Sequence, residues 1–127
     1  MDLIIITEKP ITYESVFNAA EKGLSDLIIM ADCSELFSMW KDDEGFELEF
    51  SPNDRLNDPD SLMDHDVIVK CPKKDAYLTN LGYTSVEMAK KIIELLKPLF
   101  GEMWIQSDES DDWFGTADEF IQNYNQQ

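Results

Sequence analysis

The sequence predicts an α+β fold: a mixed or antiparallel sheet of four to six strands, two main helices on one face, and a short C-terminal helix. Three observations lead to this prediction. Apolar runs at 3–7 and 27–31 are typical of buried strands. An alternation of period two at 46–50 is typical of a strand with one solvent-facing side. Apolar residues with helical spacing occupy 84–100.

The first quarter of the chain reads as strand, helix and strand. Residues 3–7 form a continuous apolar run, so we expect a strand in the centre of the sheet. Thr12 is a suitable N-cap for a helix, and Ile11 and Val16 have the spacing of a hydrophobic staple. Gly23 can end this helix. The apolar run at 27–31 predicts a second buried strand.

The middle of the chain predicts more strands and a long loop. Phe46, Leu48 and Phe50 alternate with glutamates, which predicts aromatic and aliphatic side chains inside and carboxylates outside. A less distinct strand at 36–40 precedes it, and a loop at 41–45, with Gly45 supplying the turn, would join the two. Residues 51–66 are rich in Pro, Asn and Asp and predict a surface loop, with a helical turn near Leu62. Residues 67–71 predict another strand.

The last third predicts two helices and a strand. Thr84 and Glu87 have the spacing of a capping box, and a helix should follow to about Phe100, with Pro98 in its last turn and Gly101 as its stop. Residues 103–106 predict a strand. Thr116 and Glu119 have the spacing of a second capping box, which predicts the start of a short terminal helix.

These elements fit one domain that covers 1–127, in the order β-α-β-β-β-β-α-β-α. A variant of the ferredoxin-like split β-α-β arrangement is one topology that this order allows. A chain of this length buries enough surface to fold without a disulfide or a metal.

The charge of the chain is large and unevenly distributed. The formal net charge is −17, from 27 acidic and 10 basic residues. Residues 26–66 carry −11 and residues 102–119 carry −7, whereas 67–97 carry +3. Such a surface repels nucleic acid and anionic membranes, so we expect no direct binding to either.

We expect no export signal and no membrane span in this chain. Its first ten residues lack a basic region, and no apolar segment approaches the length of a membrane span. We therefore expect a cytoplasmic protein in which Cys33 and Cys71 are reduced structural thiols.

Candidate catalytic and metal-binding groups are few, and we expect no catalytic residue, no metal and no cofactor. His65 lies between Asp64 and Asp66 but has no fixed relation to a nucleophile, so a solvated loop histidine is the simpler interpretation. Two oxygen-rich stretches, 53–60 and 108–112, could hold a weak cation site. The first lacks the spacing of an EF-hand, and the second has no basic residue nearby for phosphoryl chemistry.

The combination of acids with large aromatic residues points instead to protein binding. Tryptophan and tyrosine are preferred anchors in binding hot spots, and flanking charge steers an oppositely charged partner. A net charge of −17 also exceeds the magnitude of about 2–8 that solubility needs. The predicted partner-binding residues lie in two acidic stretches: Trp40, Asp42, Asp43, Glu44, Glu47, Glu49, Asp54, Asp58 and Asp60 in the first, and Asp108, Glu109, Asp111, Asp112 and Trp113 in the second.

In size, acidity and α+β pattern the chain is similar to the small acidic immunity proteins of bacterial toxin systems, and to phage proteins that mimic the charge of DNA. The resemblance implies a non-catalytic inhibitor of a basic partner, such as a nuclease toxin or another nucleic-acid-binding protein. It rests on no sequence motif, so no functional residue is carried over from it.

Two other hypotheses remain open. A small enzyme or ligand-binding domain would use Lys70, Lys73 and Lys74 as an anion site near Pro72. A homodimer would pair the apolar strand edge at 36–40 between two chains.

Overall fold

The computed structural model describes residues 1–24, 26–58, 65–107 and 113–124. Its elements in chain order are β1 (Asp2–Thr7), α1 (Tyr13–Gly23), β2 (Ile28–Asp32), β3 (Leu36–Lys41), β4 (Glu44–Arg55), α2 (His65–Lys70), β5 (Tyr77–Tyr83), α3 (Val86–Phe100), β6 (Met103–Ser107), β7 (Trp113–Thr116) and α4 (Ala117–Asn123).

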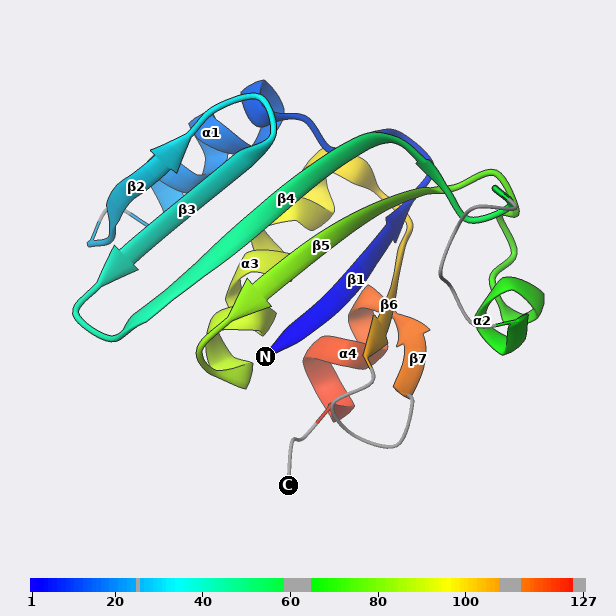
Figure 1. Ribbon diagram of the computed structural model, residues 1–127. Helices are drawn as coiled ribbons and strands as arrows, with labels where there is room; N and C mark the ends of the chain where they lie inside the picture. The colour runs from blue at the N-terminus through cyan, green and yellow to red at the C-terminus, as the bar shows by residue number, and fades with distance from the viewer. Residues whose placement is uncertain (25, 59–64, 108–112, 125–127) are drawn as a thin grey trace.

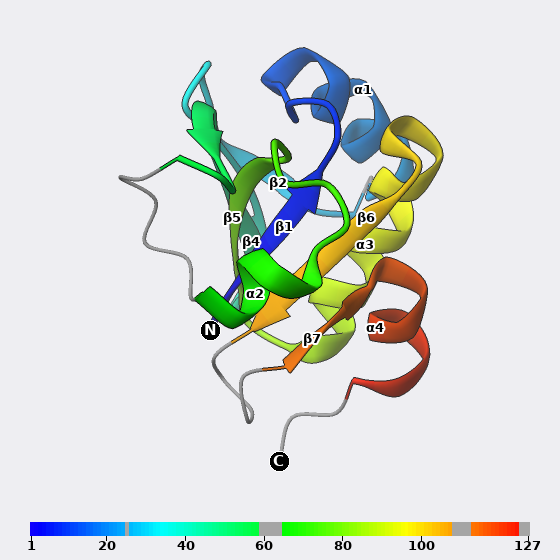
Figure 2. The same cartoon turned by 90° about the vertical axis from the view of Figure 1, so that its right-hand side faces the viewer.

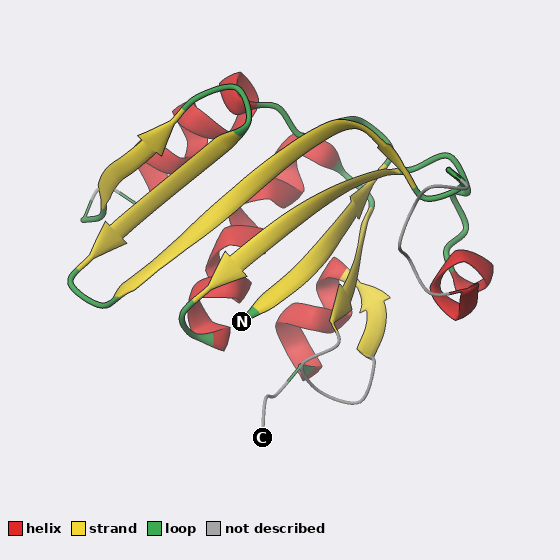
Figure 3. Ribbon diagram, viewed as in Figure 1, coloured by secondary structure: helices red, strands yellow, loops and turns green. Residues whose placement is uncertain are grey.

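Within the described residues the strands form a single antiparallel sheet in the order β2-β3-β4-β5-β1-β6-β7 (Figures 1 and 3). The prediction of an α+β fold with an antiparallel sheet is confirmed. The predicted number of four to six strands is wrong, because the sheet has seven. Strands β5 and β6 lie on either side of β1 and are joined in the chain by α3.

Helices α1, α3 and α4 lie on one face of the sheet, which is seen edge-on in Figure 2. The main core lies between these helices and the sheet and includes Leu3, Ile5 and Leu48. Helix α2 lies on the opposite face. There a smaller core joins Val67 of α2 and Cys71, which follows this helix, to four further buried residues: Ile6, Leu56, Ala76 and Trp104.

Strand β1 occupies the central position that its apolar sequence predicts. It pairs with β5 on one side and β6 on the other. Leu3 and Ile5 face the helices, whereas Ile6 points to the opposite face, and all three are buried. An apolar residue is therefore required at almost every position of this strand.

Strand β4 follows the predicted alternation. Phe46, Leu48 and Phe50 are buried in the main core, whereas Glu47 is half-buried and Glu49 is exposed. The glutamates therefore lie on the face of the sheet opposite α1 and α3.

The hairpin between β3 and β4 is tighter than the sequence predicts. Lys41 pairs directly with Glu44, so only Asp42 and Asp43 form the connection. Asp42 has a positive φ of 56°, a conformation that Asp adopts more readily than most residues. Gly45 does not supply the turn but lies in β4, opposite Trp40.

The segment 67–71 is not the strand that we predict. Its first four residues form most of α2, and Cys71 follows the helix. Val67 and Cys71 are buried, Ile68 is half-buried and Val69 is exposed. Two buried residues four positions apart occupy one face of a helix, and a segment with only four apolar residues, interrupted by Lys70, fits the period of a strand or of a helix.

The C-terminal end of helix α2 is capped by the side chain of Lys74. The Lys74 ammonium donates to the carbonyl oxygens of Ile68, Val69 and Cys71 at 2.5, 2.8 and 2.7 Å. These carbonyls belong to the end of the helix, where no backbone N–H group is available to them and where a positive charge is favoured by the helix dipole.

Two strands are absent from the sequence-based prediction. Strand β5 contains Asn80 and Gly82, which are unfavourable in strands, yet Thr79, Leu81 and Tyr83 alternate toward the core. Strand β7 has only four residues and pairs with β6. Both are stabilised by neighbours in the sheet, which a local pattern does not reveal.

The predicted helices are present, with one change of cap. Thr12 is the N-cap of α1, and Thr116 with Glu119 forms the predicted capping box of α4. In α3 the N-cap is Ser85, whose hydroxyl accepts from the Met88 amide at 3.2 Å. Thr84 instead accepts from the Gly45 amide at 3.1 Å and so connects the hairpin to the start of α3.

We predict that Leu48→Ala lowers the free energy of unfolding by about 2–5 kcal/mol, because it leaves a cavity in the main core. Glu49→Ala, one position along on the exposed face, should change it by no more than about 0.5 kcal/mol. Urea denaturation of both variants measures the difference. Equal losses would contradict the assignment of the two faces.

Candidate functional site

The part of the sheet made by β2, β3, β4 and β5 has one face that α1, α3 and α4 do not cover, and we call it the open face (Figure 2). The residues that point to it follow from strand alternation and register: Ile28, Leu36, Ser38, Trp40, Glu47, Glu49, Asn80 and Gly82.

Glu47 and Glu49 lie in the middle of the open face. Glu47 is opposite Ser38 on β3 and Gly82 on β5. Glu49 is opposite Leu36 and Asn80. No direct cross-strand neighbour is basic, so the two carboxylates, about 7 Å apart along the strand, are not neutralised within the sheet.

Trp40 covers Gly45 on the same face. A Cβ atom at position 45 would lie 2.5 Å from the Trp40 ring, so the indole occupies the space above the glycine. Trp40 is half-buried, and its partner on β2, Ile28, is 65 % exposed. These two side chains form an apolar area beside the two glutamates.

The hairpin acids Asp42, Asp43 and Glu44 are exposed at the end of β3 and β4. A hollow of about 540 Å³ lies beside them and is also lined by Asp26 at the start of β2 and by Ser85 at the start of α3. Lys41 and Lys91 are the basic residues in its lining. The fold thus brings a fourth carboxylate, from a different part of the chain, to the three of the hairpin.

The other predicted binding residues are not brought to this surface or are not described. Trp113 is half-buried in β7, at the edge of the sheet farthest from β2. Its ring packs edge-on against Phe120 and Tyr124, and each pair of ring centroids is 5.5 Å apart. Strands β5, β1 and β6 separate β7 from β4, a distance of roughly 20 Å at about 4.8 Å per strand.

Asp58 is half-buried, and the backbone of Asp54 belongs to β4 while its side chain lies outside the described part. The remaining predicted residues lie outside the described residues: Asp60, Asp108, Glu109, Asp111 and Asp112.

Within the residues that the structure describes, no group of three or more His, Cys, Asp or Glu side chains gathers around a possible metal position. The side chain of His65, which begins α2, and residue Asp64 lie outside that description.

The lysines that we considered as an anion site have partners within the chain. Lys73 forms an ion pair with Glu8 at 2.9 Å, and the hydrogen bond and charge of that carboxylate raise the pKa of Lys73. Lys74 donates to the end of α2. Neither ammonium is therefore left without an intramolecular acceptor, which reduces the support for an anion site at this corner.

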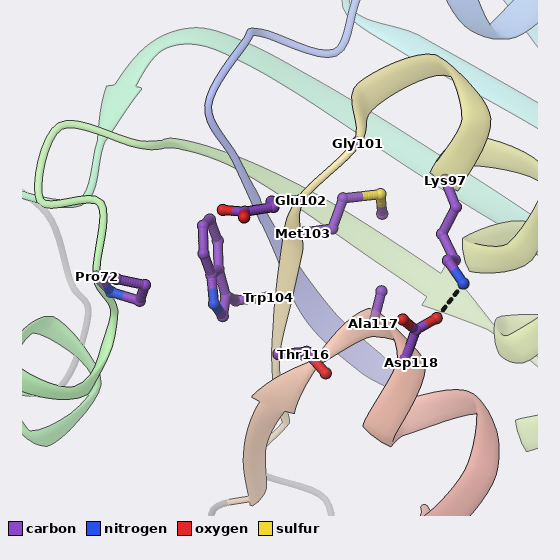
Figure 4. A pocket seen from close by; sticks show the side chains of 9 residues that line it. All are labelled: Pro72, Lys97, Gly101, Glu102, Met103, Trp104, Thr116, Ala117 and Asp118. Carbon is purple, nitrogen blue, oxygen red and sulfur yellow. Dashed lines mark hydrogen bonds and ion pairs between the residues drawn. The ribbon is translucent and has the colours of Figure 1, made fainter.

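A second hollow, of about 390 Å³, lies near the same corner (Figure 4). Pro72 faces Trp104 across it, and the Lys97–Asp118 ion pair lies at its other side. Trp104 is only 5 % exposed, and the polar groups of the lining do not form a pair of nucleophile and base. The arrangement indicates no reaction.

The two cysteines differ in environment. Cys33 is exposed in the turn between β2 and β3, whereas Cys71 is buried in the smaller core. Burial raises the pKa of the Cys71 thiol, because removal from water disfavours the thiolate. Cys71 is thus a structural residue, as the sequence predicts.

Comparison with known proteins gives no relative. Neither the family models, the curated proteins nor the solved structures include a match to this chain. Among the described helices, none combines the length and the apolar character needed to cross a membrane.

Sequence reasoning missed two residues of this surface. Asp26 and Ile28 join it only because β2 pairs with β3 and because α1 ends near the hairpin. The apolar run at 27–31 predicts a strand buried on both faces, and nothing in it distinguishes Ile28 as exposed.

We predict that Lys74→Ala destabilises the protein by about 1 kcal/mol, because the last carbonyls of α2 lose their donor. Lys9→Ala removes the same charge from an exposed position outside the helices and is the control. Urea denaturation of both variants makes the comparison. If the two lose the same stability, the ammonium contributes only net charge.

We predict that iodoacetamide modifies Cys33 rapidly in the native protein and leaves Cys71 unmodified on the same timescale. Cys71 is buried and its pKa is raised, so little thiolate is available to react. Peptide mass spectrometry after timed labelling at pH 8 measures both rates, with urea-unfolded protein as the control. Comparable native rates would contradict the placement of Cys71.

Proposed function

We propose that this protein is a non-catalytic inhibitor that binds a basic protein through the open face and the β3–β4 hairpin. The best-supported type is a toxin-neutralising protein of the immunity class, acting in the cytoplasm. The partner would be a nuclease toxin or another protein whose substrate groove is positive.

The observation that carries this proposal is the convergence of acids on the uncovered half of the sheet. Glu47 and Glu49 lie on the open face, Asp42–Glu44 lie at its end, and no helix of the described residues covers them. Trp40 lies between the two groups and supplies a large aromatic surface. An aromatic anchor within a charged surround is a common composition of binding surfaces.

The free protein holds these charges at a cost. Two like charges about 7 Å apart repel by roughly 0.6 kcal/mol in water before screening by salt. The five carboxylates outnumber the two lysines beside the hairpin, Lys41 and Lys91, so they raise the electrostatic energy of the free state and produce a negative potential around the open face. A positively charged groove would relieve the repulsion and would be attracted from a distance.

A protein that mimics the charge of DNA in the manner of some phage proteins would use the same surface. It differs in partner, since it would compete for many DNA-binding proteins rather than for one toxin. The ligand-binding alternative at Lys70, Lys73 and Lys74 has less support, because Lys73 and Lys74 have intramolecular partners.

We also propose that the fold is a variant of the ferredoxin-like split β-α-β arrangement. The placement of β5 and β6 around β1, with α3 as their connection, supports it. The hairpin of β2 and β3 would then be an addition at one side, and β7 with α4 an addition at the other. Such a fold hosts many functions and does not choose among them.

We predict that joint neutralisation of the five acids slows association with the partner at least about tenfold at low salt, because these charges steer the encounter. The variant carries Asp42→Asn, Asp43→Asn, Glu44→Gln, Glu47→Gln and Glu49→Gln. The partner is first captured from host extract at low and high salt, then purified, and its association rate is measured by stopped flow against ionic strength.

The control removes the same amount of charge from exposed acids on α1, α3 and the loop before β5: Glu14→Gln, Glu21→Gln, Asp75→Asn, Glu87→Gln and Glu94→Gln. This variant should associate within about threefold of the unmodified protein. Equal rates for all three proteins would exclude the open face and hairpin as the binding surface.

A further inference from the structure

The accessible strand edge of this sheet is not the one that the sequence suggests. Strand β3, which contains the apolar residues at 36–40, pairs with β2 on one side and β4 on the other. Strand β2 pairs only with β3 among the described strands and ends the sheet. Its outer backbone N–H and C=O groups are thus available to another chain.

The side chains of β2 are unusually apolar for an edge strand. Five large apolar side chains are exposed within the described residues, and two of them, Ile28 at 65 % and Met30 at 67 %, belong to β2. Natural edge strands are commonly protected by charged residues, and the only charged residue in 28–32 is Asp32 at the end of the strand. Exposed apolar residues beside free backbone groups are the features that a pairing strand uses.

Charge and geometry distinguish between a second copy and a different partner. Two copies would each bring a net charge of −17 to the contact. The register of β2 against β3 also shifts between Ile29 and Ala31, so Met30 is an extra residue in β2. A regular incoming strand would have to accommodate this one irregularity, whereas two copies of the chain would have to accommodate two in one ladder.

The surroundings of β2 favour a basic segment. Asp26, just before the strand, lines the same hollow as Asp42, Asp43 and Glu44. These four carboxylates outnumber the two lysines of the lining, Lys41 and Lys91, so the charge near the first residues of β2 is negative. An incoming strand with apolar residues against Ile28 and basic residues near this end would satisfy both features.

We propose that the basic partner adds an extended segment to the outer edge of β2, with alternating apolar and basic side chains. The inference rests on the proposed function and specifies how the partner docks: backbone pairing along Ile28–Asp32 gives affinity, and the carboxylates select a basic sequence.

The test uses a capped peptide of three lysine–valine repeats and the full-length, nitrogen-15-labelled protein. We expect chemical-shift changes and slower hydrogen exchange at the backbone amides of Ile28–Asp32. The matched control is the same peptide with alternate backbone nitrogens methylated, which keeps its charge and side chains but removes hydrogen-bond donors. It should bind at least about tenfold more weakly.

Ile28→Lys should reduce affinity for the unmodified peptide by at least about tenfold, since it replaces an apolar contact with a positive charge that repels the lysines of the peptide. Met30→Lys is the second variant, and both positions are exposed enough to tolerate the change. The proposal would be overturned if the two peptides bound equally well or if neither bound. It would also be overturned if the chemical-shift changes were confined to the acids of the open face and hairpin. The association rates of the five-acid variant test the proposed function separately, so either can fail alone.

Discussion

The pairing of β1 with both β5 and β6 is the interaction on which the rest of the structure depends. It brings together strands that are seventy or more residues apart in the chain and leaves β1 with apolar side chains on both faces. Leu3 and Ile5 anchor the main core under the helices, and Ile6 anchors the smaller core under α2. A single strand thus belongs to both cores, which links their stabilities.

The unequal covering of the sheet follows from this arrangement. Helices α1, α3 and α4 share one face, and α2 covers only the part of the other face near β1 and β6. Strands β2 to β4 therefore bury their core side chains on the helix side, and their other side is free to carry glutamates beside Trp40 and Ile28. The uneven covering of the sheet by helices thus determines where acidic side chains can lie.

Local sequence patterns predicted the correct element where a strand is buried on one face only, or where apolar residues with helical spacing extend over several turns. The alternation of Phe46, Leu48 and Phe50 and the apolar stripe of α3 are examples of elements that could be predicted. The prediction of a strand at 67–71 was wrong, because so short an apolar segment fits a strand and a short helix equally well. Strand β5 is stabilised by β1 and β4 rather than by its own composition.

The same division holds for the candidate site. The acids of the hairpin and of β4 could be read from the sequence, because strand alternation places them outside. The contribution of Asp26, the exposed edge of β2 and the packing of Trp113 against α4 depend on contacts between distant segments. The charge pattern predicted the acids of the open face and the hairpin, whereas the further residues around them follow only from the tertiary structure.

The position of Trp40 above Gly45 has a practical consequence. Trp104 is nearly inaccessible and Trp113 packs against α4, so of the three indoles Trp40 alone lies on the open face. Its emission therefore reports the polarity of that face from within the unmodified protein. The surface carries its own optical probe, and an event there can be followed by fluorescence without an attached dye.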